Sequence, residues 1–299
     1  MVDTGRRALR YEAERVASSQ PPLLLAALKI ADTVAAGLHG RRRSGPGDAF
    51  WQYRPYQWGD NARSIDWRRS ARSDPVYVRE NEWEAAQTVW LWRDDSPSMR
   101  YASRADLPEK EERATLLLLA SAALLLRASE QVGLLQPGSR PLRGRTALNR
   151  IAEELTTGSS AAGPEVVSSL PPATVLRRHS QVVLFGDFLA PLGEIERSLA
   201  GFAAQGVRGH VVQILDPAEE ALPMRGRVRF EGMEGEGDLL VSRVNRLRPG
   251  YQARIAAQKD GLRALARRLG WTSSLHHTDR PPQTALLALQ VVLSLRPDG

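Results

Sequence analysis

A carboxylate and two hydroxyls follow a short apolar segment at alternate positions of one turn. Residues 89–92 read VWLW, and Asp94, Ser96 and Ser98 come soon after with a D-x-S-x-S spacing. Oxygen atoms arranged in this way can converge on one hard cation, and water or a partner's carboxylate then completes an octahedral shell. The spacing favours a site for Mg²⁺ or Mn²⁺ formed by these three side chains.

A second carboxylate, Asp187, follows the apolar segment VVLF at residues 182–185. If the two segments are the first and fourth strands of a doubly wound sheet, their carboxyl ends meet where the strand order reverses, and open α/β sheets bind ligands there. We therefore expect Asp94 and Asp187 to share one cation. Asp and Ser are also common helix caps and turn residues, so a purely structural role for the motif stays open.

Short apolar strands alternate with helices along most of the chain. The expected strands cover residues 76–78, 88–92, 132–135, 182–185, 210–215 and 272–276. The expected helices cover residues 23–38, 111–129, 147–155, 195–205, 250–269 and 283–295. The alternation indicates an α/β fold with a doubly wound, mostly parallel sheet, Rossmann-like, and helices on both faces. Residues 231–238 read as the tip of a hairpin.

Composition excludes several kinds of site. The 299 residues include no cysteine, so any metal must be bound by oxygen or imidazole. No phosphate-binding loop or dinucleotide fingerprint occurs, so we expect no nucleotide site. Of the two most apolar stretches, residues 21–38 contain Lys29 and Asp32, and residues 114–126 are shorter than the roughly 20 residues that span a bilayer. With no signal peptide apparent, we expect a cytoplasmic protein without a membrane span.

Positive charge is concentrated near the N-terminus. The net charge is +7, and residues 1–79 hold 13 Arg and one Lys against eight acidic residues, which gives +6. A basic segment can attract phosphates, anionic lipid or an acidic protein. No helix-turn-helix, RNA-binding or zinc signature accompanies it, so we expect no nucleic-acid partner.

An Arg-rich and aromatic block precedes the strand that carries Asp94. It contains GPGDAF at residues 45–50, YRPY at 53–56, GDNARSIDW at 59–67 and AR at 71–72. This block resembles the bacterial family catalogued as domain of unknown function 58. In that family, the strand that carries the adhesion site is preceded by a block with the pattern G-x-G-x-E-F-x-x-x-R-x-Y-x-x-G-D-D-x-R-x-I-D-W-x-x-x-A-R. Together with Asp187, the D-x-S-x-S spacing is similar to the metal-ion-dependent adhesion site of von Willebrand factor A-like domains.

The resemblance implies a von Willebrand factor A-like domain with no established enzymatic activity. It also implies a partner ATPase of the MoxR-type AAA+ class, acting in assembly or maturation of a client complex. Longer members carry membrane helices, so this chain looks like a short soluble form. We expect residues 1–80 to hold an N-terminal helix and an ordered irregular segment packed on the sheet, and residues 81–299 to form the A-like domain.

The resemblance also bears on the cation's ligands. The family site normally includes a Thr in a G-G-T-like loop, whereas residues 156–162 here read TTGSSAA, so Ser159 or Ser160 could replace it. Arg93 is an unusual charge beside Asp94, and its guanidinium could pair with Asp94 or Asp95 and weaken cation binding.

The Arg and aromatic block allows two interpretations. In one, its rings pack on the sheet while its Arg and Asp side chains pair with one another. In the other, the same side chains form a partner-docking face beside the cation crevice. The candidate docking residues are Arg54, Asp60, Arg63, Asp66, Trp67 and Arg72.

Two functions from different classes remain. The first is a non-catalytic protein-interaction module, in which the cation at Asp94, Ser96, Ser98, Asp187 and Ser160 accepts a partner's carboxylate. The alternative is a metal-dependent phosphoesterase or nuclease that uses the Asp94/Asp187 crevice, because metal sites of this kind can activate water. A catalytic Ser-His-Asp triad could also be drawn from Ser96, either His179 or His210, and Asp187. The sequence lacks the G-x-S-x-G elbow that would support such a triad.

Overall fold

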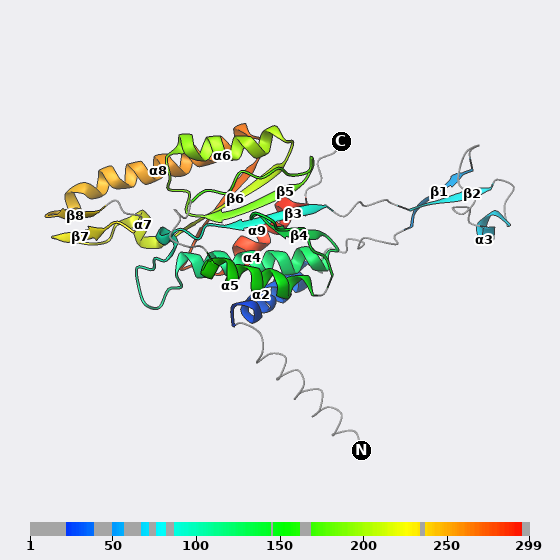
Figure 1. The fold of residues 1–299 in the computed structure, drawn as a ribbon, viewed down its shortest axis with the longest axis horizontal. Helices are drawn as coiled ribbons and strands as arrows, with labels where there is room; N and C mark the ends of the chain where they lie inside the picture. The colour runs from blue at the N-terminus through cyan, green and yellow to red at the C-terminus, as the bar shows by residue number, and fades with distance from the viewer. Residues whose placement is uncertain are drawn as a thin grey trace, which may run out of the picture. The chain divides into compact units, whose positions relative to one another are not determined.

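The computed structural model describes residues 22–38, 50–56, 67–71, 76–81, 87–144, 146–161, 169–233 and 237–294 (Figure 1). The chain divides into two compact units, one of residues 1–38 with 87–299 and one of residues 39–86. Helix α2 (Pro22–Leu38) therefore belongs to the unit that contains the central sheet.

The larger unit is built around a five-stranded parallel sheet. Its strands are β3 (Thr88–Arg93), β4 (Gln131–Leu134), β5 (Gln181–Gly186), β6 (Arg208–Leu215) and β9 (Thr272–His277). They lie in the order β4-β3-β5-β6-β9. Chain order reverses at β3, which pairs with β4 on one side and β5 on the other. The α/β fold and the adjacency of the two site strands are confirmed, although β5 is the third strand of the sheet rather than the fourth.

Helices cover both faces of this sheet, as Figure 1 shows. Helices α4 (Lys110–Arg127), α5 (Ala147–Ala161) and α9 (Pro282–Ser294) lie with α2 on one face, and α6 (Leu192–Ala204) and α8 (Val244–Arg268) lie on the other. Successive strand side chains point to opposite faces. Val183 and Phe185 of β5 accordingly join one apolar cluster while Val182 and Leu184 join the other.

Helices α2 and α4, which contain the two long apolar stretches of the sequence, pack against each other. Leu24, Ala27, Ala31 and Val34 of α2 are buried in the same cluster as most of the apolar side chains of α4. The apolar run at residues 114–126 is thus core of the α/β unit. Within the described ranges, no helix combines the length and the apolar character needed to cross a bilayer.

The smaller unit contains a strand pair, of which the sequence predicted only the second strand, at residues 76–78. Strand β1 (Phe50–Pro55) pairs antiparallel with β2 (Tyr77–Asn81), and the register shifts between Phe50 and Gln52. The short helix α3 (Trp67–Ser70) lies between them in the chain, and the Tyr77 amide donates to Ser70 Oγ at 2.9 Å. Arg and aromatic residues mask the period-2 pattern in this strand.

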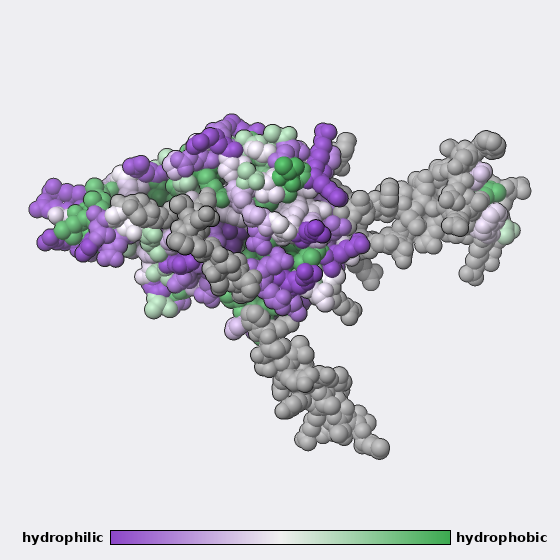
Figure 2. Space-filling view, in the orientation of Figure 1, coloured by the Kyte–Doolittle hydropathy of each residue, from purple (hydrophilic) through white to green (hydrophobic). Residues whose placement is uncertain are grey.

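Several shorter elements were missed or misjudged in extent. Helix α7 (Pro217–Ala221) and the 3₁₀ helix η2 (Pro97–Met99) are too short to show a periodic pattern. The predicted hairpin is present as β7 (Val228–Glu231) and β8 (Asp238–Val241), with apolar and hydrophilic side chains next to each other (Figure 2). Helix α5 continues to Ala161, so residues 156–161 are helical where a ligand loop was expected.

Close packing of β6 on β9 gives a stability prediction. A Cβ on Gly209 would lie 1.9 Å from Trp271 Cε3, and Trp271 is buried and donates its indole N–H to Val207 O. We expect Gly209→Ala to lower the free energy of unfolding by about 2 kcal/mol or more, through overpacking. Gly193→Ala is the matched control, because no atom lies within 4 Å of its Cβ position. Equal urea midpoints for the two variants would contradict this packing.

Candidate functional site

The D-x-S-x-S segment forms a tight turn at the carboxyl end of β3. The Asp94 amide donates to Phe185 O at 2.8 Å and so continues the pairing of β3 with β5. Asp94 Oδ1 accepts the Ser96 amide at 2.9 Å. Ser96 stands at the N-cap of η2, but its side chain makes no cap hydrogen bond. Its hydroxyl instead lies 3.0 Å from Ser98 Oγ, so capping does not account for the two serines.

Asp187 lies next to this turn, at the end of β5. Its Oδ2 accepts Ser98 Oγ at 3.1 Å, and its Oδ1 accepts the Leu189 amide at 3.1 Å. The Asp187 carbonyl accepts Gln213 Nε2 at 2.9 Å, which ties it to β6. The structure thus brings together Asp94, Ser96, Ser98 and Asp187, from two segments about ninety residues apart.

A glycine makes the approach of the two segments possible. A Cβ on Gly186 would lie 3.0 Å from Asp94 Cβ and 3.3 Å from Asp94 Oδ2. Any larger residue before Asp187 would press on the Asp94 carboxylate. The Gly-Asp pair at the end of β5 therefore provides both the second carboxylate and the room for the first.

Asp94 is buried with half of its carboxylate unsatisfied. The residue is 0% exposed, and its Oδ2 has no hydrogen-bond partner within the described residues. Burial raises the pKa of Asp94 to about 7; the hydrogen bond from Ser96 opposes that shift and the charge of Asp187 adds to it. A buried oxygen without a partner is costly, which makes this atom a candidate ligand for a cation.

The oxygen set fits a small divalent ion. An octahedral Mg²⁺ shell places neighbouring ligand oxygens about 3 Å apart. The Ser96–Ser98 and Ser98–Asp187 oxygen pairs lie 3.0 and 3.1 Å apart. The residues that would hold Mg²⁺ or Mn²⁺ are therefore Asp94, Ser96, Ser98 and Asp187. This set has two carboxylates, and the described ranges contain no group of three His, Cys, Asp or Glu suited to a metal.

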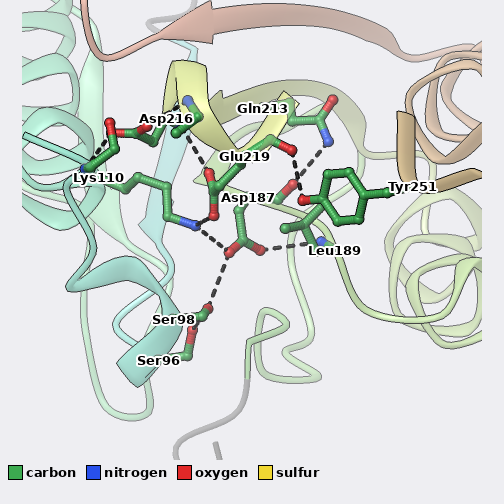
Figure 3. Close-up of polar contacts among 11 residues, drawn as sticks. Ser96, Ser98, Lys110, Asp187, Leu189, Gln213, Asp216, Glu219 and Tyr251 are labelled. Atoms are coloured by element: carbon green, nitrogen blue, oxygen red, sulfur yellow. Dashed lines mark hydrogen bonds and ion pairs between the residues drawn. The ribbon is translucent and has the colours of Figure 1, made fainter. Parts of the chain in front are cut away.

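A buried lysine, which the sequence patterns did not reveal, joins this site. Lys110, the first residue of α4, is 0% exposed, and its Nζ lies 2.9 Å from Asp187 Oδ2 and 2.5 Å from Glu219 Oε1. Figure 3 shows the ammonium between the two carboxylates. Burial lowers the pKa of Lys110, but the charges of Asp187 and Glu219 outweigh that effect and leave the pKa raised. Burial also raises the pKa of Glu219.

Glu219 is held in place by the start of α7. Asp216 and Glu219 form a capping box, in which Glu219 Oε2 accepts the Asp216 amide at 2.8 Å. Tyr251 donates its hydroxyl to Glu219 O at 2.6 Å. The D-x-x-E spacing of residues 216–219 is a capping signature that could have located this turn, but its link to Lys110 is visible only in three dimensions.

Two further residues were considered in the sequence analysis of this site, Arg93 and Ser160. Arg93 pairs with Glu111 of α4, so the expected pairing with Asp94 or Asp95 is wrong. Successive residues after a strand point to opposite sides, which separates the guanidinium from the Asp94 carboxylate. Ser160 lies in α5, and its side chain is outside the described part of the structure, as is that of Ser159.

The candidate docking residues are only partly described. Arg54 is in β1, where its backbone pairs with Val78, and Trp67 of α3 is 65% exposed. The remaining four lie outside the described residues: Asp60, Arg63, Asp66 and Arg72.

The two histidines considered for a catalytic triad do not reach the site. His210 is buried with its ring nitrogens 2.5 Å from Thr272 Oγ1 and 3.0 Å from Ser274 Oγ, and burial lowers its pKa to about 4. His179 precedes β5 while Asp187 follows it, so the length of the strand separates them. Neither histidine is therefore placed to form a triad with Ser96 and Asp187, as the missing G-x-S-x-G elbow indicated.

Comparison with known proteins places the chain in context. A family model described as "Protein of unknown function DUF58" matches residues 52–261. An uncharacterized protein of Mycobacterium tuberculosis (strain ATCC 25618 / H37Rv) is 27% identical over 230 residues, covering 74% of this chain and 71% of that protein. An uncharacterized protein of Mycobacterium bovis matches with the same figures.

Two solved structures resemble the chain at low sequence identity. An aerotolerance-related membrane protein from Bacteroides fragilis is 14% identical, with 69% of this chain and 98% of that chain covered and a TM-score of 0.37. The conserved hypothetical protein BatB from Bacteroides thetaiotaomicron is 15% identical, with 70% and 99% covered and a TM-score of 0.32.

Burial of Asp94 predicts a distinctive pH dependence in chelator-treated protein. Because its folded pKa of about 7 exceeds the ordinary 3.8, the folded state holds the proton more tightly than the unfolded state. The free energy of unfolding should therefore fall as pH rises from about 4 to 7, by up to about 4 kcal/mol. Asp94→Asn should remove this part of the slope in urea denaturation at stepped pH. The control Asp95→Asn should keep the slope, and equal slopes in wild type and Asp94→Asn would contradict the assignment.

Proposed function

Because the chain belongs to the family described as protein of unknown function DUF58, we propose that it is a non-catalytic protein-interaction module with a divalent-cation site. The cation, Mg²⁺ or Mn²⁺, would be held by Asp94, Ser96, Ser98 and Asp187. When bound, it would supply a Lewis-acidic position for a carboxylate of a partner protein. The observation that carries the proposal is the buried Asp94 Oδ2, which has no described partner.

The arrangement of the other ligands supports this reading. Both serine hydroxyls and Asp187 Oδ2 form a chain of contacts at 3.0 and 3.1 Å next to Asp94. Ser98 is only partly buried, so the site has a side open to a partner, whereas Asp94 and Ser96 are fully buried. Buried ligands thus lie beside a partly exposed one that solvent or another protein can reach.

The proposed partners are a MoxR-type AAA+ ATPase and a client protein whose assembly or maturation it serves. Support comes from the family resemblance of the Arg and aromatic block, and the family match includes this block from residue 52 onward. In this proposal Arg54, Asp60, Arg63, Asp66, Trp67 and Arg72 contact the partner. The exposed indole of Trp67 suits such a contact, because Trp and Arg are enriched at the energetic centres of interfaces.

The contacts of the two carboxylates give a hydrolase less support. The side-chain oxygens of Asp94 and Asp187 accept hydrogen bonds from the Ser96 amide, Ser98, Lys110 and the Leu189 amide. No histidine contacts them in the described part of the chain. Asp94 and Asp187 are cation ligands in this proposal, and Glu219 is held by Lys110 and the Asp216 amide, so none of these carboxylates is left free to act as a general base.

Direct titration with metal tests the proposal. We expect calorimetric titration of the full chain with MgCl₂ or MnCl₂ to show one saturable site. Asp94→Ala, which removes the unsatisfied oxygen, should weaken binding at least about tenfold, a loss of about 1.4 kcal/mol. Asp95→Ala removes a neighbouring carboxylate and should bind as wild type does.

Three outcomes would count against the module. The wild type could show no saturable site, or Asp94→Ala could bind as tightly as wild type. Turnover of a generic phosphodiester with Mg²⁺ or Mn²⁺, abolished in Asp187→Asn, would instead establish the phosphoesterase alternative.

A further inference from the structure

Lys110 is the largest fully buried side chain of the described structure, and it carries a charge. The chain has 38 arginines and three lysines, so a lysine at a buried position stands out. A compact ammonium can fit between two carboxylates where a planar guanidinium would need a wider space. Burying such a charge is costly unless it is fully paired. Its position therefore depends on the carboxylates around it.

The ammonium shares an oxygen with the proposed cation site. Asp187 Oδ2 accepts Lys110 Nζ at 2.9 Å and Ser98 Oγ at 3.1 Å. The same oxygen cannot be fully committed to the ammonium and to a divalent ion, because two cations at one oxygen repel each other. Any cation that draws on Asp187 therefore acts against the Lys110 contact.

Glu219 is a second acceptor for the Lys110 ammonium. Its Oε1 lies 2.5 Å from Lys110 Nζ, and the α7 capping box and the Tyr251 hydroxyl fix its position. The side chain of Glu219 is 15% exposed, while that of Lys110 is 0% exposed. Lys110 can thus remain paired and buried when its contact with Asp187 weakens.

The charges of the four side chains also favour a position for Lys110 next to Glu219 when a divalent ion is bound. The side chains of Asp94, Asp187 and Glu219 can supply three negative charges, and Lys110 supplies one positive charge. With Lys110 paired to Glu219, Asp94 and Asp187 together match the charge of one divalent ion. The sum of the four charges is the same when Lys110 also contacts Asp187, but less of the negative charge then faces the cation position.

We propose that Lys110 is a built-in competitor of the divalent cation, which pairs with both Asp187 and Glu219 in the metal-free protein and with Glu219 alone when the cation is bound. The inference rests on the proposed function and adds its regulation. Lys110 keeps the intrinsic cation affinity low, so that tight binding requires the additional carboxylate of a partner. It also keeps the strand ends folded without metal. Glu219 sets the balance as the alternative acceptor.

Two substitutions of opposite expected effect test this mechanism. Lys110→Met keeps the length of the side chain and removes its charge, so Mn²⁺ should bind at least about tenfold more tightly in calorimetric titration. Glu219→Gln leaves the ammonium to Asp187 alone, so Mn²⁺ should bind at least about tenfold more weakly. Lys259→Met removes a partly buried lysine, paired with Glu220, and should leave the affinity unchanged.

Thermal unfolding gives a second readout. In chelator, Lys110→Met should melt at a lower temperature than wild type, because Asp187 and Glu219 then face each other without a cation. Saturating Mn²⁺ should raise its melting temperature by more than it raises that of wild type, since the divalent ion replaces the missing charge. A variant that stays unfolded in saturating Mn²⁺ would overturn the proposal and leave Lys110 a structural ion-pair residue.

The remaining outcomes separate the two proposals. If wild type binds Mn²⁺, Asp94→Ala does not, and Lys110→Met binds no more tightly than wild type, competition is wrong and the cation site stands. If neither wild type nor Lys110→Met binds Mn²⁺, both proposals fail together.

Discussion

The structure depends on the burial of carboxylates where the strand order reverses. β3 and β5 end side by side, and each is followed by an aspartate with almost no contact with solvent. Charged groups in such a place need compensation by hydrogen bonds or by opposite charge. Asp187 has the Lys110 ammonium, whereas Asp94 has, among the described residues, only the hydrogen bond from the Ser96 amide to its Oδ1, and burial raises the pKa of Asp94 to about 7. This imbalance is the physical reason to assign a cation to the site.

The surrounding elements fix these groups from several directions. Gly186 gives the Asp94 side chain room, Gln213 of β6 holds the Asp187 carbonyl, and the α7 capping box holds Glu219. Helix α4 begins at the residue that provides the ammonium and continues as the most buried helix of the unit. The site is therefore joined to the core, and a change in its charge balance should affect stability as well as binding.

Sequence reasoning located the parts of the site that are encoded locally. Strand periodicity placed Asp94 and Asp187 at strand ends, and the rule for parallel sheets placed those ends together. It missed the pairing of Lys110 with Asp187 and Glu219, because these contacts join residues 77 and 109 positions apart and no local pattern marks them. It misassigned Arg93, whose true partner is Glu111 on a helix. α7 was missed because it is short, and β1 was missed because it is rich in Arg and aromatic residues.

The most direct test of the central claim is a crystal structure of the full chain grown with MnCl₂, with anomalous diffraction used to locate manganese. The account predicts one anomalous peak in contact with the Ser96 and Ser98 hydroxyls and between the Asp94 and Asp187 carboxylates. Lys110 should then be paired with Glu219. Crystals grown in saturating MnCl₂ that show no manganese at these strand ends, with Lys110 still in contact with Asp187, would contradict the account.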